Sequence, residues 1–151
     1  MSKVNKPKRV ILHCTATPDY TYGIGDFDRF KIADVDRWHR ARGWDSCGYH
    51  MTVSRSGIIE FGRPMNIIGA HTLGHNKDTL GIAYFGSQNP TKTQLRELLN
   101  LYVLIKKTTG INYNGWFGHN EFNKFKSCPG FSMEIFRHLL KQHDQLLFAN
   151  Q

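Results

Sequence analysis

The stretch from Gly118 to Gly130 combines side chains that bind metal ions. His119, Lys126 and Cys128 lie within a dozen residues of one another, and Pro129-Gly130 ends the stretch. Imidazole nitrogen and thiolate sulfur are preferred ligands of zinc. A lysine two residues before the cysteine adds a positive charge near any group that the metal polarises. A single His–Cys pair does not complete a zinc site, so a further ligand must come from elsewhere.

His13 can supply that ligand from the other end of the chain. Residues 9–15 form a short apolar run without strict alternation, which predicts a strand buried on both faces. On a strand, His13 shares a face with Ile11 and Thr15, whereas Cys14 points to the opposite face. Such a histidine is more often a hydrogen-bonded core residue than a ligand. A buried imidazole needs a polar partner, however, and a metal ion is one such partner.

His13, His119 and Cys128 together would provide three protein ligands. Three protein ligands with one open position are typical of catalytic zinc, whereas structural zinc is usually closed by four. The sequence therefore indicates one catalytic Zn²⁺ per chain.

Two further residues could take part in acid–base chemistry at such a site. Tyr49 and His50 alternate on a predicted strand, so only one of them can face the metal. A tyrosine hydroxyl can donate a hydrogen bond to a developing oxyanion, although by residue type alone aromatic packing is the preferred interpretation of Tyr49. Glu121 is an alternative general base.

Composition limits the class of protein. A chain of 151 residues with 40% hydrophobic and 21% charged residues fits one globular domain, expected to span residues 1–151. The net charge of +8 favours encounter with polyanions, but the basic residues are scattered. Three widely separated cysteines argue for reduced thiols rather than a disulfide framework. No apolar run predicts a signal peptide or a membrane span, so we expect a cytoplasmic location until release.

The apolar periodicity predicts a mixed α/β (α+β) domain, with a central mixed β-sheet flanked by about three amphipathic helices. Expected strands are residues 9–15, 48–55, 58–61 and 79–85, and residues 17–25 and 111–129 read as loops. One helix is expected over 28–42, and a second runs from Thr91 to a stop at Gly110. A third follows the cap residue Ser132. Its predicted inner face is Met133, Phe136, Leu139, Leu140 and Leu147.

Several motifs in this order resemble one family, the zinc-dependent N-acetylmuramoyl-L-alanine amidases of the amidase-2/peptidoglycan-recognition superfamily. The chain resembles in particular small phage endolysins of the T-odd coliphage lysozyme type, and the resemblance spans nearly the whole chain. The motifs are residues 10–17, Arg37-Trp38-His39, Gly43-Trp44, Gly48-Tyr49-His50, Gly69-Ala70-His71, Gly81-Ile82-Ala83, Gly118-His119 and residues 126–130.

The resemblance implies a role for each matching residue. His13, His119 and Cys128 match the zinc ligands, whereas Tyr49 and Lys126 match the catalytic tyrosine and lysine. His71 matches a histidine on the rim of the substrate groove. Trp38, His39 and His50 match structural positions. Residues 120–125 depart from the pattern of close relatives, which leaves the path of this loop open.

The implied activity is hydrolysis of the amide between N-acetylmuramic acid and L-alanine in peptidoglycan, by a phage or prophage endolysin that lyses the host. Such an enzyme is expected as a monomer without a separate wall-binding domain. It would need a holin to pass from the host cytoplasm to the periplasm and cell wall. Alternatives are a muropeptide-recycling amidase and a peptidoglycan-binding protein without activity. A third is an inhibitor of the phage RNA polymerase. No basic helix face or aromatic–basic pattern predicts specific nucleic-acid binding, and no membrane partner is expected.

Overall fold

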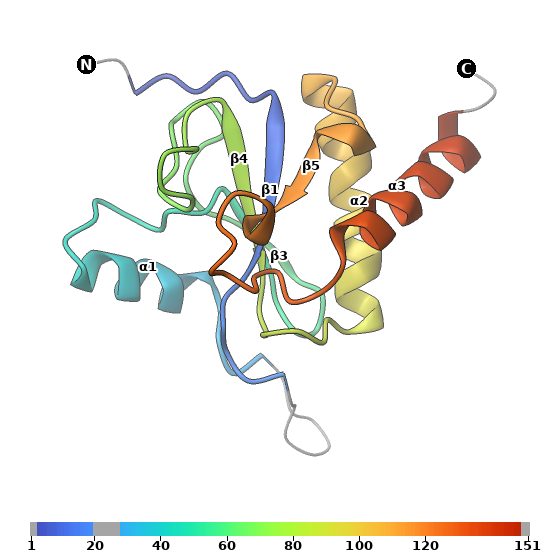
Figure 1. Cartoon of the computed structure of the whole chain (residues 1–151). Coiled ribbons are helices and arrows are strands. Elements are labelled where there is room, and N and C mark those ends of the chain that lie inside the picture. Colours follow the sequence, from blue (N-terminus) through green and yellow to red (C-terminus); the bar gives the residue numbers. More distant parts are fainter. Residues whose placement is uncertain (1–2, 20–27, 149–151) are drawn as a thin grey trace.

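The computed structural model describes residues 3–19 and 28–148, which form a mixed five-stranded sheet with helices on both faces (Figure 1). The strands are β1 (Arg9–Cys14), β2 (Met51–Val53), β3 (Ile59–Phe61), β4 (Thr79–Tyr84) and β5 (Trp116–Gly118). The helices are α1 (Ile32–Ala41), α2 (Lys92–Thr109) and α3 (Met133–Phe148), with short 3₁₀ turns η1 (Tyr113–Gly115) and η2 (His119–Glu121). The predicted class is confirmed. The part of the predicted loop at residues 20–25 lies outside the described residues.

The sheet has the order β3-β2-β4-β1-β5, with β1 at the centre of a parallel group. β1 pairs in parallel with β4 on one side and with β5 on the other, whereas β2 and β3 form an antiparallel hairpin. The carboxyl ends of β1 and β5 therefore meet at the same edge of the sheet. Ligands bind at this kind of edge in open α/β sheets.

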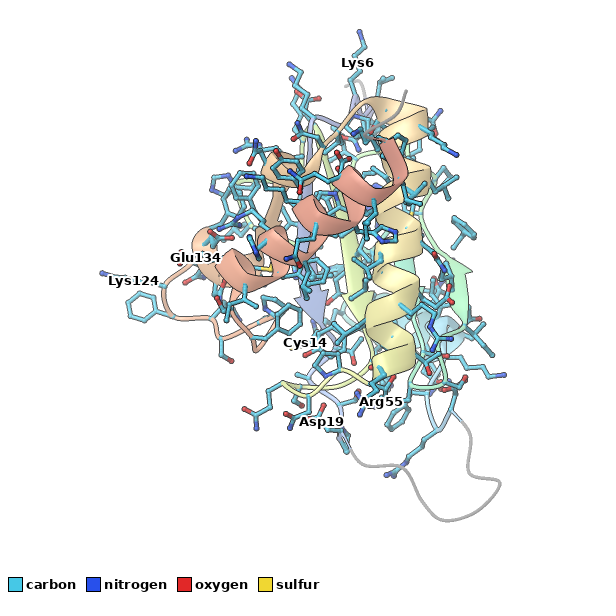
Figure 2. All side chains as sticks on the ribbon, turned by 90° about the vertical axis from the view of Figure 1, so that its right-hand side faces the viewer. Lys6, Cys14, Asp19, Arg55, Lys124 and Glu134 are labelled. Atoms are coloured by element: carbon cyan, nitrogen blue, oxygen red, sulfur yellow. The ribbon has the colours of Figure 1, made fainter. Side chains whose placement is uncertain are left out.

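The main core lies between the sheet and helices α2 and α3. Alternation along β1 directs Val10, Leu12 and Cys14 into it, as the sequence predicts. A smaller cluster of Val35, Cys47 and Phe85 lies beneath α1, where Trp38 packs. Figure 2 shows Cys14 inside the fold at the end of β1, while Lys6 and Lys124 project from the surface. All three cysteines are free thiols.

The helix ends follow their capping chemistry. The Thr91 hydroxyl accepts the N–H of Gln94 at 3.0 Å and opens α2, and Gly110 closes it in the left-handed conformation at φ 81°. Helix α1 begins at Ile32 rather than near residue 28. The carboxylate of Asp34 caps the N–H of Lys31, while Asp28 instead accepts the N–H of Ser56. Of the helices that the structure describes, none is long and apolar enough to cross a membrane.

Two further expectations need correction. Residues 116–118, predicted within a loop, form β5 because three residues suffice to pair with β1. On α3, Leu139 is 41% exposed and Leu147 is 47% exposed, so neither belongs to the inner face. The buried stripe consists of Met133, Phe136 and Leu140, which is narrower than the apolar pattern of the helix.

Candidate metal centre and active site

Strand register explains why His13 and His119 lie together. Leu12 of β1 pairs with Gly118 of β5, and each histidine follows its paired residue directly. The two imidazole centroids are 4.7 Å apart. Parallel pairing therefore turns a separation of more than a hundred residues into neighbouring side chains at one sheet edge.

Cys128 reaches the same point from the loop that precedes α3. Its carbonyl accepts the N–H of Asn120 at 2.8 Å, and its Sγ accepts the N–H of Cys14 at 2.9 Å. The next carbonyl, that of Pro129, accepts a hydrogen bond of 2.6 Å from the buried hydroxyl of Tyr84. The loop is thus tied to β1, η2 and β4.

His13, His119 and Cys128 form the candidate metal group. Their ligand atoms all lie within 4.8 Å of one another. Burial lowers the pKa of both histidines, so each presents the neutral imidazole that a metal requires. A hydrogen bond with the Cys14 thiol, and then burial, raise the pKa of Cys128 in the metal-free protein. A coordinated cation reverses that preference, because a ligating thiol is deprotonated. Two imidazoles and one thiolate fit zinc.

Tyr49 faces this group from beside His13, with ring centroids 5.2 Å apart. Burial raises the pKa of its phenol, so the hydroxyl stays protonated and can act as a hydrogen-bond donor. His50 is held elsewhere. Both residues lie before β2, which begins at Met51 and not at residue 48 as predicted, so strand alternation does not set their directions. Nδ1 of His50 accepts the N–H of Gly81 at 3.0 Å and its Nε2 lies 2.8 Å from the carbonyl of Ile67.

Lys126 is an exposed residue at the mouth of the site. Burial, and then the positive charge of Lys126, lower the pKa of His119. A cavity of about 460 Å³ brings together the three candidate ligands and three of the other residues named from the sequence, but not Glu121. Its lining includes His13, Tyr49, His71, His119, Lys126 and Cys128.

A second hollow of about 430 Å³ continues from this cavity. It extends past Leu73, Asn76 and Phe122, and Leu73 is 97% exposed there. The two hollows form one groove because they share lining residues. These are Trp44, Ala70, His71, His119 and Lys126.

His71 lines both hollows, and its ring also contacts the buried imidazole of His13. Its Nδ1 lies 3.0 Å from Nε2 of His13. Burial lowers its pKa to about 3, so the ring is neutral. The predicted place on the groove is therefore only part of its environment.

Glu121 is held away from the metal group. Its carboxylate pairs with the Arg137 guanidinium at 2.6 and 3.0 Å and accepts the N–H of Gly118 at 3.0 Å. Burial opposes ionisation, but these bonds outweigh it and lower the pKa of Glu121. The carboxylate fixes η2 and is not placed to act as a general base. His39 is likewise structural, since its Nδ1 accepts the N–H of Gly48 at 2.8 Å.

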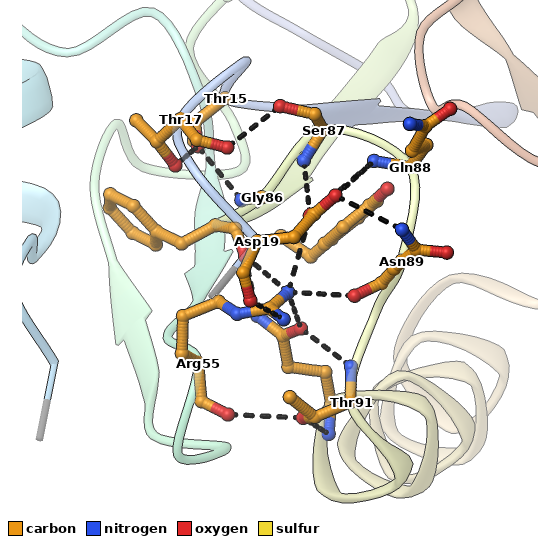
Figure 3. A network of polar contacts seen from close by, with 12 residues as sticks. Thr15, Thr17, Asp19, Arg55, Gly86, Ser87, Gln88, Asn89 and Thr91 are labelled. Carbon is orange, nitrogen blue, oxygen red and sulfur yellow. Dashed lines mark hydrogen bonds and ion pairs between the residues drawn. The ribbon is translucent and has the colours of Figure 1, made fainter. Parts of the chain in front are cut away.

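A polar network that the sequence did not reveal supports the Cys128 loop (Figure 3). Asp19 accepts the N–H of Ser87 at 2.7 Å, and Arg55 donates to the carbonyls of Phe85 and Asn89 at 3.1 and 3.0 Å. These bonds fix the segment of residues 85–89. This segment lies directly against Gly130 of the Cys128 loop, where a Cβ would come 2.2 Å from the Ser87 carbonyl oxygen. Glycine at that position is the only sequence signal of the contact.

Comparison with known proteins agrees with this geometry. The family profile of N-acetylmuramoyl-L-alanine amidase matches residues 3–131. The endolysin of Escherichia phage T7 is 29% identical over 135 residues, which cover 83% of this chain and 82% of that protein. The structure of the amidase LysC from Clostridium intestinale URNW superposes with a TM-score of 0.79 at 27% identity, over 93% of this chain and 89% of that one.

A third relative was solved with a ligand. Peptidoglycan recognition protein LE, in complex with tracheal cytotoxin (a monomeric diaminopimelic acid-type peptidoglycan), has a TM-score of 0.69 and 26% identity, over 96% of this chain and 85% of that one. With the family profile matching most of its length, the chain belongs to the N-acetylmuramoyl-L-alanine amidase family.

Proposed function

We propose that the chain is a zinc-dependent peptidoglycan amidase that acts as a phage endolysin. Its reaction is hydrolysis of the amide between N-acetylmuramic acid and L-alanine, the activity of its family. The observation that carries zinc dependence is the convergence of His13, His119 and Cys128, whose ligand atoms lie within 4.8 Å of one another. One Zn²⁺ per chain would be held by these three residues, in a single catalytic domain.

When bound, Zn²⁺ acidifies water and polarises the scissile carbonyl. Tyr49 keeps its phenolic proton and donates a hydrogen bond that orients the reacting oxygen atoms. Lys126 supplies a positive charge for the tetrahedral oxyanion that develops on the substrate. Because a thiolate ligand donates more charge than imidazole, the Lys126 ammonium also offsets the weaker polarisation that Cys128 brings.

The groove that runs from the metal group past Leu73 provides room for a glycan–peptide substrate. The complex of the related recognition protein LE with a monomeric peptidoglycan supports this choice of substrate class. An endolysin role includes release from the host cytoplasm through a holin lesion. Inhibition of the phage polymerase stays a prediction from the resemblance alone.

Mass analysis of digested peptidoglycan tests the proposal. The zinc-loaded protein should release free peptides that begin with L-alanine, and a chelator should stop their release. Cys128→Ala should abolish release, whereas Cys47→Ala, a control at a thiol outside the metal group, should retain it. Cleavage between sugars, or binding to sacculi without any product, would contradict the amidase assignment. Cleavage of soluble muropeptides but not of sacculi would replace the endolysin role with recycling.

A further inference from the structure

His71 contacts the imidazole of a proposed zinc ligand through a defined pair of nitrogen atoms. Nδ1 of His71 lies 3.0 Å from Nε2 of His13. The hydroxyl of Thr72 lies 3.0 Å from the same Nδ1 and 3.3 Å from the same Nε2. His13 is only 1% exposed, so these neighbours decide which of its nitrogens carries the proton.

Thr79 sets the direction of these hydrogen bonds. Its hydroxyl has one proton, which it donates to the carbonyls of His75 at 2.8 Å and Asn76 at 3.0 Å. Nε2 of His71 lies 3.3 Å from the same hydroxyl oxygen, and must therefore donate its own proton to it. A neutral His71 protonated at Nε2 has a lone pair at Nδ1. His13 then donates from Nε2, and its Nδ1 keeps the lone pair that a metal needs.

A hydrogen bond donated in the opposite direction, from His71 to His13, would leave His13 unable to bind a metal. If His71 donated from Nδ1, Nε2 of His13 would accept that proton and its Nδ1 would be protonated. Neither nitrogen of a neutral His13 would then offer a free lone pair. The arrangement that Thr79 favours is thus the one that leaves Nδ1 of His13 free for a metal.

The His71 ring packs closely against two glycines, Gly69 and Gly81. A Cβ at Gly81 would lie 2.5 Å from Cδ2 of His71, and a Cβ at Gly69 would lie 2.8 Å from the same atom. The side chain of Asn76 accepts the backbone N–H groups of His71 and Thr72, both at 2.8 Å. The ring is thus placed by two glycines and by a closed loop, independently of any substrate.

We propose that His71 is a positioning residue that presents Nδ1 of His13 to Zn²⁺ by holding the Nε2–H of the same imidazole. The inference rests on the proposed zinc site and assigns His71 a function other than contact with the substrate. Partners that orient a metal-bound histidine commonly raise metal affinity by about 10- to 100-fold.

Two isosteric substitutions separate the roles. His71→Asn keeps an acceptor oxygen near the position of Nδ1, whereas His71→Leu has a similar shape and no acceptor. Zinc affinity is measured by competition with a chromophoric chelator, and kcat and KM are measured on a soluble muropeptide. We expect His71→Leu to weaken zinc binding by about 10- to 100-fold and His71→Asn to stay within a few-fold of the parent. Unchanged zinc affinity in both variants, with only KM raised, would overturn the proposal.

A measurement on the unmodified protein avoids any defect in folding. Long-range ¹H–¹⁵N spectra of the zinc-loaded chain, with histidine labelled by ¹⁵N, report the protonation and ligation of each ring nitrogen. We expect Nε2 of His13 to carry the proton and Nδ1 to bind the metal. Ligation through Nε2 would contradict this inference but leave the amidase proposal intact. A protein that binds no zinc would contradict both.

Discussion

The backbone N–H of Cys14 donates a hydrogen bond of 2.9 Å to Sγ of Cys128, across 114 positions of sequence. An N–H donor favours the thiolate that metal binding needs. Because Cys14 directly follows His13, the end of β1 supplies one candidate ligand and orients another. The strand therefore largely shapes the candidate metal site.

Tyr84 should affect the metal site through the Cys128 loop. Tyr84→Phe removes the hydrogen bond to the buried carbonyl of Pro129 and should cost about 1–3 kcal/mol of unfolding free energy. We also expect weaker zinc binding in a chelator competition. Tyr102→Phe is the matched control, because Tyr102 donates a bond of the same length, 2.6 Å, to Asp144 between α2 and α3. The idea fails if both variants lose stability but neither changes zinc affinity.

Lys126 and Tyr49 should act on turnover and not on metal content. Lys126→Ala and Tyr49→Phe should each reduce kcat by about a hundredfold or more, with zinc bound at one ion per chain. The control is Lys124→Ala, which removes an exposed lysine two positions away. Turnover by Lys126→Ala equal to that of the parent would rule out its oxyanion role.

The Arg55 network should contribute to stability because its charges are mostly buried. The side chains of Arg55 and Asp19 are 12% and 21% exposed. Arg55→Met leaves Asp19 without its cationic partner and should destabilise the fold by about 3 kcal/mol or more in urea unfolding. Arg37→Met, in a surface pair where the arginine side chain is 66% exposed, should change stability by less than about 0.5 kcal/mol. Equal losses of unfolding free energy in the two variants would show that the network of Figure 3 stabilises the fold no more than a surface ion pair.

Histidine protonation should make the metal-free protein sensitive to mild acid. Burial lowers the pKa of His71 to about 3 and that of His39 to about 4, whereas an unfolded histidine titrates near 6.5. Below about pH 6.5 the unfolded chain takes up protons that the folded chain refuses, so stability falls towards pH 4. The carboxylates with lowered pKa, such as Glu121, add their loss only at lower pH.

Urea midpoints at pH 7.5 and pH 5 measure this loss. The midpoint should be lower at pH 5, and the difference should shrink in His39→Gln, which removes one of the titrating groups. A midpoint that is equal or higher at pH 5 would contradict the assigned neutral state of these histidines.

The candidate site residues could be named from the sequence, whereas the contacts that hold them in place could not. His13, His119 and Cys128 carry recognisable chemistry, and the apolar run around His13 identifies its strand. The pairing of Glu121 with Arg137 could not be read in this way, because a loop carboxylate and a helical arginine share no periodic pattern. The same holds for Tyr84, which looks like an ordinary core residue until its hydroxyl is seen to bond the Pro129 carbonyl.

The errors at α3 and β5 also have physical causes. Helix α3 has more leucines than its narrow contact with the core can bury, so Leu139 and Leu147 stay partly exposed. Strand β5 is too short to show alternation, and only pairing with β1 defines it. The loop at residues 120–125 takes its path from η2 and from the bond between Asn120 and Cys128, which are tertiary features.

The most direct test of the central claim is a crystal structure of the zinc-loaded protein with anomalous diffraction recorded at the zinc edge. The account predicts one strong peak per chain, bonded to Nδ1 of His13, to an imidazole nitrogen of His119 and to Sγ of Cys128. Zinc bound elsewhere, or no peak between these three side chains, would contradict it.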